Sequence, residues 1–262
     1  MSGIALPTGG DYSTYDVDLT ALWTNVAYDV GDAAAQWDAG KLPYLHLMFH
    51  PGEQGAYPMI EQIADGSWNA MISRWLERVK AYELTGRRCV IVPLPEMNGN
   101  WTSYGVDMDN PNPQAFIDVY RRIHATARSF GIKSDFCWAP NNTGVGRLAD
   151  WWPGGDVVDV VGMSCYNGGG IFPDAEWESP EQVIAPYVDE VRVFTDLPFV
   201  VTQVGCGMGD DRAPRWLDDL VALQVDGVID DYIWFNIDQF AWADGVQDFN
   251  RRVSEGFAFC GD

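Results

Sequence analysis

The chain has 262 residues, a formal net charge of −22, and 12 Trp, 11 Tyr and 12 Phe residues. This length suits one large domain with a substantial core. Twelve Trp residues are more than a core usually needs, and sugar-binding clefts use such rings for stacking, although core packing is the alternative for any single ring. The negative charge excludes nucleic acid and anionic membranes as expected partners, whereas a neutral substrate is compatible with it.

The remaining composition argues against a metal, a cofactor or a membrane span. The five cysteines form no Cys-x-x-Cys pair, buried thiols are the default for them, and only three histidines occur. No apolar run approaches the roughly 18 residues of a membrane helix. Residues 1–7 lack the basic and long apolar regions of a signal peptide, so either the protein is not exported by that route or its sequence is trimmed.

Short apolar runs and helical patterns alternate through the first half of the chain. Helical spacing is clearest for Trp68, Ile72 and Trp75, which share one face of a helix. In chain order the patterns predict strands at 3–7 and 16–26, a short helix at about 32–39, a strand at 44–49, a helix at about 67–86 and a strand at 89–92.

The second half continues the alternation. Pro113 opens a helix that Gly131 ends, and Ser179 with Gln182 forms a capping box before another helix. Strands are predicted at 134–139, 157–163, 198–204 and 232–237, and further helices at Trp151-Trp152, at about 216–221 and at about 246–255.

This alternation predicts an α/β fold with a single domain over residues 1–262. Nearly every strand is continuously apolar, as in parallel sheets with both faces covered, and no linker divides the chain. Seven clear strands and the doubtful one at 3–7 indicate a (β/α)8 TIM barrel whose first strand is short or trimmed. A doubly wound open sheet is the alternative, but it would call for a Gly-rich phosphate loop, and none occurs.

Two residues at strand ends carry the candidate chemistry. Counting back from the last strand places Glu96 after the fourth strand and Gln203 at the end of the seventh. Barrels of this type present catalytic groups at the C-terminal ends of their strands. The alternative for Glu96 is a surface side chain in a loop that caps a strand.

The text around Glu96 resembles a known family. Pro-Glu-Met-Asn-Gly-Asn-Trp-Thr-Ser-Tyr-Gly, residues 95–105, is similar to the acid/base motif of family 26 glycoside hydrolases, the β-mannanase family. The resemblance covers about residues 40–240. It also includes the segments Ile63–Trp68, Trp138–Asn141, Trp152–Gly154 with the Val-Asp-Val-Val-Gly run, and Tyr166-Asn167.

The resemblance implies a retaining double displacement. Glu96 would be the general acid/base, and position 203 would hold the nucleophile, about 5–5.5 Å from it. This chain departs from the family with Gln203 where Glu is called for, and with Pro95 where the family has His. Gln203 is either an inactivating Glu→Gln change, which we favour, or the mark of a pseudoenzyme that only binds. Asp238 is a further nucleophile candidate, although a loop Asp that caps a turn is the simpler interpretation.

Around this pair the resemblance and the strand ends predict a set of substrate-binding side chains. Tyr166 would hydrogen-bond the residue at 203, and Trp234 would floor the site of the cleaved sugar, with packing at the barrel mouth as its alternative. For His50 a structural role is the alternative to substrate contact. The predicted contacts are His50, Asn98, Trp101, Tyr104, Trp138, Asn141, Tyr166, Asn167 and Trp234.

The function predicted is that of a retaining endo-acting β-glycosidase. Its substrate would be β-mannan or a related β-linked polysaccharide, with β-1,3-xylan and mixed-linkage glucan as alternatives. A non-catalytic carbohydrate-binding protein on the same barrel is the alternative of a different class. Neither a cofactor nor a metal is expected; the chain is expected to be a monomer, and the family suggests extracellular action on oligo- or polysaccharide.

Overall fold

Eight parallel strands close into one barrel in this computed structural model, which describes residues 2–5, 17–27, 30, 33–49, 58–106, 111–169, 174–207 and 211–235. Each strand pairs with the next along the chain, and β1 pairs with β8 to close the ring. The strands are β1 (Ser2–Ala5), β2 (Leu19–Asn25), β3 (Leu42–Met48), β4 (Val90–Pro93), β5 (Asp135–Trp138), β6 (Val160–Asn167), β7 (Phe199–Cys206) and β8 (Asp231–Phe235). The predicted barrel is confirmed, and its first strand is short.

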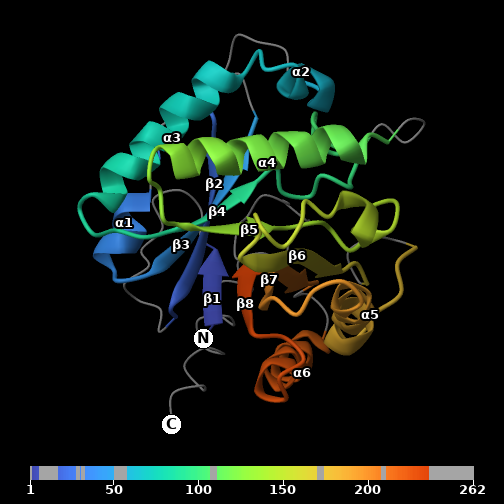
Figure 1. Cartoon of the computed structure of the whole chain (residues 1–262). Helices are drawn as coiled ribbons and strands as arrows, with labels where there is room; N and C mark the ends of the chain where they lie inside the picture. Colours follow the sequence, from blue (N-terminus) through green and yellow to red (C-terminus); the bar gives the residue numbers. More distant parts are fainter. Residues whose placement is uncertain are drawn as a thin grey trace.

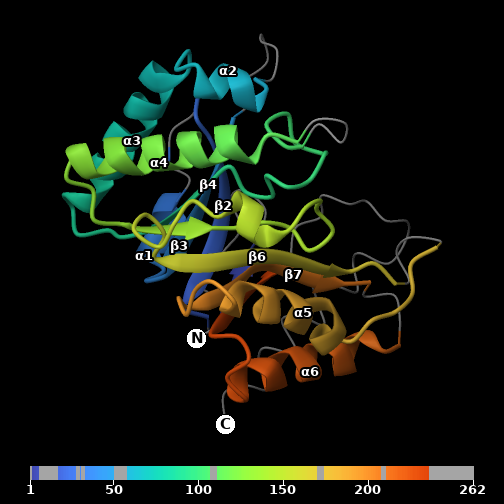
Figure 2. The same cartoon turned by 45° about the vertical axis from the view of Figure 1, so that its right-hand side comes forward.

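Helices lie on the outside of the strands, as Figures 1 and 2 show. They are α1 (Ala34–Asp38), α2 (Ile60–Ala64), α3 (Asn69–Glu83), α4 (Pro113–Ser129), the 3-10 helix η3 (Leu148–Trp151), α5 (Pro180–Arg192) and α6 (Ala213–Val225). Local sequence explains where the longer ones begin. The Asn112 side chain accepts a hydrogen bond from the Ala115 amide before Pro113 starts α4, and the predicted capping box of Ser179 and Gln182 starts α5.

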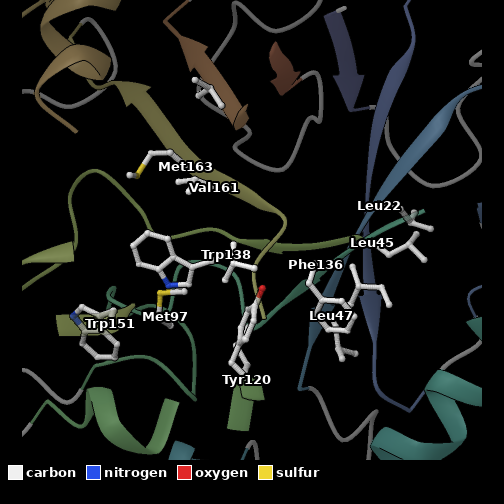
Figure 3. Packing of buried hydrophobic residues seen from close by; sticks show 14 of the residues in the cluster. Leu22, Leu45, Leu47, Met97, Tyr120, Phe136, Trp138, Trp151, Val161 and Met163 are labelled. Carbon is white, nitrogen blue, oxygen red and sulfur yellow. The ribbon is translucent and has the colours of Figure 1, made fainter. Parts of the chain in front are cut away.

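Two groups of buried side chains result from the alternation along each strand. Small and medium side chains, including Ala21, Val92 and Ala139, fill the inside of the barrel. Larger ones fill the layer between the strands and the helices, where Trp138 lies near Met97 and Val161 (Figure 3). The four described cysteines, Cys89, Cys137, Cys165 and Cys206, are buried, as predicted.

Several predicted boundaries need correction. The short helix α2 was not predicted, and β6 spans Val160–Asn167 instead of 157–163. The strand starts later because the Asp159 carboxylate accepts a hydrogen bond from the Phe136 amide at 2.8 Å, which fixes the turn before the strand. Tyr166 therefore lies within β6, and Gln203 lies within β7. The predicted helix at 246–255 and Asp238 lie outside the described residues.

Candidate active site

The turn after β4 aims Glu96 toward the end of β5. Leu94 and Glu96 have φ values of +49° and +58°, which non-glycine residues rarely adopt and which cost about 1–3 kcal/mol each. The Glu96 amide donates to the carbonyl of Ala139 at 2.7 Å, which ties this turn to the segment after β5. Such strain is common where a side chain must be held in one orientation for chemistry.

Both oxygens of the Glu96 carboxylate are engaged by neutral donors. Trp101 Nε1 donates to Glu96 Oε2 at 2.6 Å, and Asn141 Nδ2 donates to Glu96 Oε1 at 3.0 Å. Trp101 is nevertheless 49% exposed, so its ring forms an apolar surface beside the acid. Gly99 makes this arrangement possible, because a Cβ there would lie 2.2 Å from the Trp101 ring.

Asn98 holds the β4 and β5 loops together and does not face a substrate. It is 1% exposed; its Nδ2 donates to the Asn141 carbonyl at 2.9 Å, and its Oδ1 accepts from the Asn141 amide at 2.8 Å. Gly144 lies so close that a Cβ would be 2.0 Å from Asn98 Nδ2. The predicted substrate contact is wrong for Asn98, because its amide group is already used to position Asn141.

Tyr104 has a similar supporting role. Its side chain is buried, and its hydroxyl donates to the carbonyl of Pro95 at 3.0 Å, directly before Glu96. Burial, and next the negative charge of Glu96, raise the pKa of Tyr104 well above its ordinary value, so it stays a donor. This contact also corrects the prediction that Tyr104 binds substrate.

Gln203 on β7 is paired with Tyr166 on β6. The Tyr166 hydroxyl donates to Gln203 Oε1 at 3.0 Å, which confirms the predicted hydrogen bond between them. Burial raises the pKa of Tyr166 well above its ordinary value, and the negative charge of Glu96 is the next cause. Tyr166 is therefore a protonated donor that contacts Gln203 and lies within electrostatic reach of Glu96.

The strand register brings Glu96 and Gln203 to the same end of the barrel. Asn141, which donates to Glu96, forms a bridge with Ser164 on β6, and Ser164 is in turn the ladder partner of Gln203 on β7. Neighbouring strands lie about 4.8 Å apart. The acid and the amide thus belong to one rim built from the ends of β4 to β7.

Three further predicted contacts are wrong, because strand alternation points these side chains away from the mouth or into a loop. Trp138 and Trp234 are fully buried outside the barrel, Trp138 at 5.1 Å from the Trp152 ring and Trp234 at 6.1 Å from the Trp216 ring. Asn167 is buried, and its Oδ1 accepts from the amides at 169 and 178. His50 lies outside the described residues.

Phe235, Trp23 and His46 were missed. Ile233 belongs to the interior cluster, so two residues later Phe235 also faces inward, where its ring lies 5.8 Å from Tyr166 and 5.3 Å from Trp23. Trp23 stacks on His46 at 4.9 Å. The period of two along a strand identifies Phe235 only after the structure has shown that Ile233 faces inward.

No group of three or more His, Cys, Asp or Glu side chains within the described part of the chain is arranged to hold a metal ion. Within the same part, none of the helices combines the length and the apolar character that a membrane crossing requires.

Comparison with known proteins places this site in a family. Residues 59–186 match the family model for glycosyl hydrolase family 26. A mannan endo-1,4-beta-mannosidase of Bacillus subtilis (strain 168) is 24% identical over 194 residues, which are 61% of this chain and 51% of the relative. These matches support glycosyl hydrolase family 26 as the family of this chain. A beta-1,3-xylanase of an Alcaligenes species is 29% identical over 110 residues, which are 41% of this chain and 22% of the xylanase.

Solved structures agree with the family 26 fold. The Bacillus subtilis mannanase BCman has a TM-score of 0.68 with 16% identity, covering 94% of this chain and 82% of that chain. A beta-mannanase from a symbiotic protist of the termite Reticulitermes speratus has a TM-score of 0.60 with 14% identity, covering 90% of this chain and 79% of that chain. The matched part of this chain spans about half the length of the curated mannosidase, with 51% of it aligned.

Proposed function

We propose that this family 26 barrel is built for retaining, endo-acting hydrolysis of β-mannan or a related β-linked polysaccharide. The observation that carries the proposal is the pairing of Glu96, held by Trp101 and Asn141, with a tyrosine-bound side chain at position 203 on the same rim. Glu96 would protonate the glycosidic oxygen and later deprotonate water. Position 203 would supply the group that attacks the anomeric carbon.

Gln203 would prevent the formation of the usual covalent glycosyl-enzyme intermediate in this chain. A carboxylate at 203 would form a glycosyl ester that water then cleaves, whereas the neutral amide is a poor nucleophile and leaves no such ester. Gln is nearly isosteric with Glu, so the substrate would still bind. We therefore infer that the Gln203 chain holds its polysaccharide without turning it over, and that a Glu at this position is the hydrolytic form.

The test is a reducing-sugar assay of the chain and its Gln203→Glu variant on β-1,4-mannan, β-1,3-xylan and mixed-linkage β-glucan. We expect Gln203→Glu to raise kcat/KM on one of them by about 10³-fold or more, since losing a catalytic nucleophile costs at least that much. Adding Glu96→Gln to Gln203→Glu should remove the gain. Absence of hydrolysis in every form would refute the proposal.

A second function follows from the amide itself. Tyr166 already satisfies Gln203 Oε1, so position 203 is a stable neutral element, as a purely carbohydrate-binding barrel would have. Calorimetry with the same glycans separates the two functions, because a binding protein would bind in both forms and cleave in neither. A single domain acting as a monomer on extracellular glycan belongs to either proposal.

A further inference from the structure

An aromatic strip crosses the mouth of the barrel from β6 to β2. We define it as Trp23 on β2, Phe235 on β8 and Tyr166 on β6. The Phe235 ring lies 5.3 Å from Trp23 and 5.8 Å from Tyr166, and the interplanar angles of 87° and 89° are edge-to-face contacts. Trp23 and Tyr166 are partly exposed, and Phe235 is 7% exposed. The strip is thus continuous, and side chains at both its ends reach the surface.

His46 supports the far end of this strip. Trp23 and His46 are ladder partners on β2 and β3, and their rings stack at 4.9 Å with an interplanar angle of 12°. His46 is fully buried, so it gives the Trp23 ring a flat and fixed surface to stack on. Trp23 therefore contacts His46 on β3 and Phe235 on β8, two residues that themselves belong to barrel strands.

The near end of the strip fixes which part of a substrate it meets. Tyr166 donates to Gln203, the position that faces the anomeric carbon in the proposed function, so the sugar carrying that carbon lies over Tyr166. Glu96, which serves the departing oxygen, has the exposed Trp101 ring beside it instead. The sugar that carries the anomeric carbon and the leaving-group sugar consequently contact different aromatic surfaces.

We propose that the aromatic strip binds the glycone side of a neutral β-glycan, with a second glycone sugar unit held at Trp23. The strip carries no charged side chain, and apolar ring surfaces suit the C–H faces of pyranoses. Aromatic surfaces on both sides of the cleavage point are what an enzyme or binder of internal chain segments needs. This inference rests on the proposed function and adds to it a second glycone position at Trp23.

The test measures binding of β-1,4-mannohexaose and β-1,3-xylohexaose to the Gln203 chain by calorimetry. Trp23→Ala should weaken hexaose binding about tenfold, because the apolar contact between the Trp23 ring and one sugar unit is lost. Trp23→Phe, which keeps a ring on His46, should lose less and guards against a folding defect in Trp23→Ala. The matched control is Trp37→Phe, since Trp37 bonds to the Arg88 carbonyl before β4 at the opposite end of the barrel; its affinity should equal that of the parent.

A second readout uses the hydrolytic background. In Gln203→Glu, Trp23→Ala should shift cleavage of the hexaose toward products with a single glycone unit. Hexaose affinity within twofold of the parent, or an unchanged product pattern, would overturn the strip while leaving the proposed function intact. A parent that binds neither hexaose, with Gln203→Glu inactive, would instead overturn the proposed function and this inference with it.

Discussion

The position of the Trp101 ring depends on the lack of a side chain at Gly99. Trp101 reaches Glu96 at 2.6 Å only because its indole packs where a Cβ of residue 99 would be. The glycine is therefore required by close approach, and its φ is not the reason. The Glu-Met-Asn-Gly motif thus contains, three residues after the acid, the space that lets an aromatic donor return to it.

We expect Gly99→Ala to displace Trp101 and to lower kcat of the Gln203→Glu form by about tenfold to 100-fold, since one of two donors to Glu96 is lost. Stability should change by less than about 1 kcal/mol because Trp101 is 49% exposed. Gly155→Ala is the matched control: a Cβ there meets nothing within 4 Å. Tryptophan fluorescence reports the displacement of Trp101, and kcat reports the loss of turnover. Equal kcat in Gly99→Ala and Gly155→Ala would contradict this role of Gly99.

At the scale of elements, the ends of β4 and β5 act as one unit because Asn98 bridges them. Asn98→Ala would leave the amide and carbonyl of Asn141 without these bonds, at a cost of about 2 kcal/mol. Asn141 would then release Glu96, and kcat of the Gln203→Glu form should fall about 100-fold with little change in KM. The measurement is kinetics together with chemical unfolding.

Asn112→Ala provides the control for this element. It removes the cap of α4 at a cost of about 1 kcal/mol. The Asn112 side chain bonds to Ala115 and Glu61 and not to the residues that hold Glu96, so the variant should lower stability and leave kcat unchanged. If Asn98→Ala loses stability to a similar degree and keeps its kcat, Asn98 is only structural. A fall in kcat confined to Asn98→Ala supports the positioning role.

Element order was predictable from sequence, but the direction in which strand side chains point was not. The helix from Pro113 and the capping box at Ser179 follow from local signals that do not depend on the rest of the fold. A continuously apolar strand such as β8 gives no sign of which residues face inward. Trp234 was therefore assigned to the mouth, which Phe235 occupies instead, and Trp138 was misassigned for the same reason. The Tyr166–Gln203 bond was predictable only through the family resemblance.

At the scale of the whole molecule, barrel closure places an ionisable ring where water does not reach. His46 is an inward-facing residue of β3 stacked beneath Trp23, and closure of all eight strands leaves it fully buried. Burial lowers the pKa of His46 from 6.5 to about 3. The folded barrel therefore keeps a neutral His46 throughout the pH range in which an unfolded chain protonates it.

This difference makes stability depend on pH in a defined direction. The folded pKa lies below the unfolded one, so above pH 6.5 His46 costs no proton-linked stability, and stability is lost as the pH falls from 6.5 toward 3. Between pH 7 and 5 this loss is about 2 kcal/mol. His46→Phe keeps a ring against Trp23 and should not show this loss of stability. Urea unfolding of the parent and the variant at pH 7 and at pH 5 would measure the difference. The carboxylates titrate alike in both proteins, so their contribution to the pH dependence cancels. As a control, His124→Phe should change the pH dependence of stability less, because His124 is only half-buried. Parallel stability curves for the parent and His46→Phe would mean that His46 protonates in the folded state and that the base of the aromatic strip is open to water.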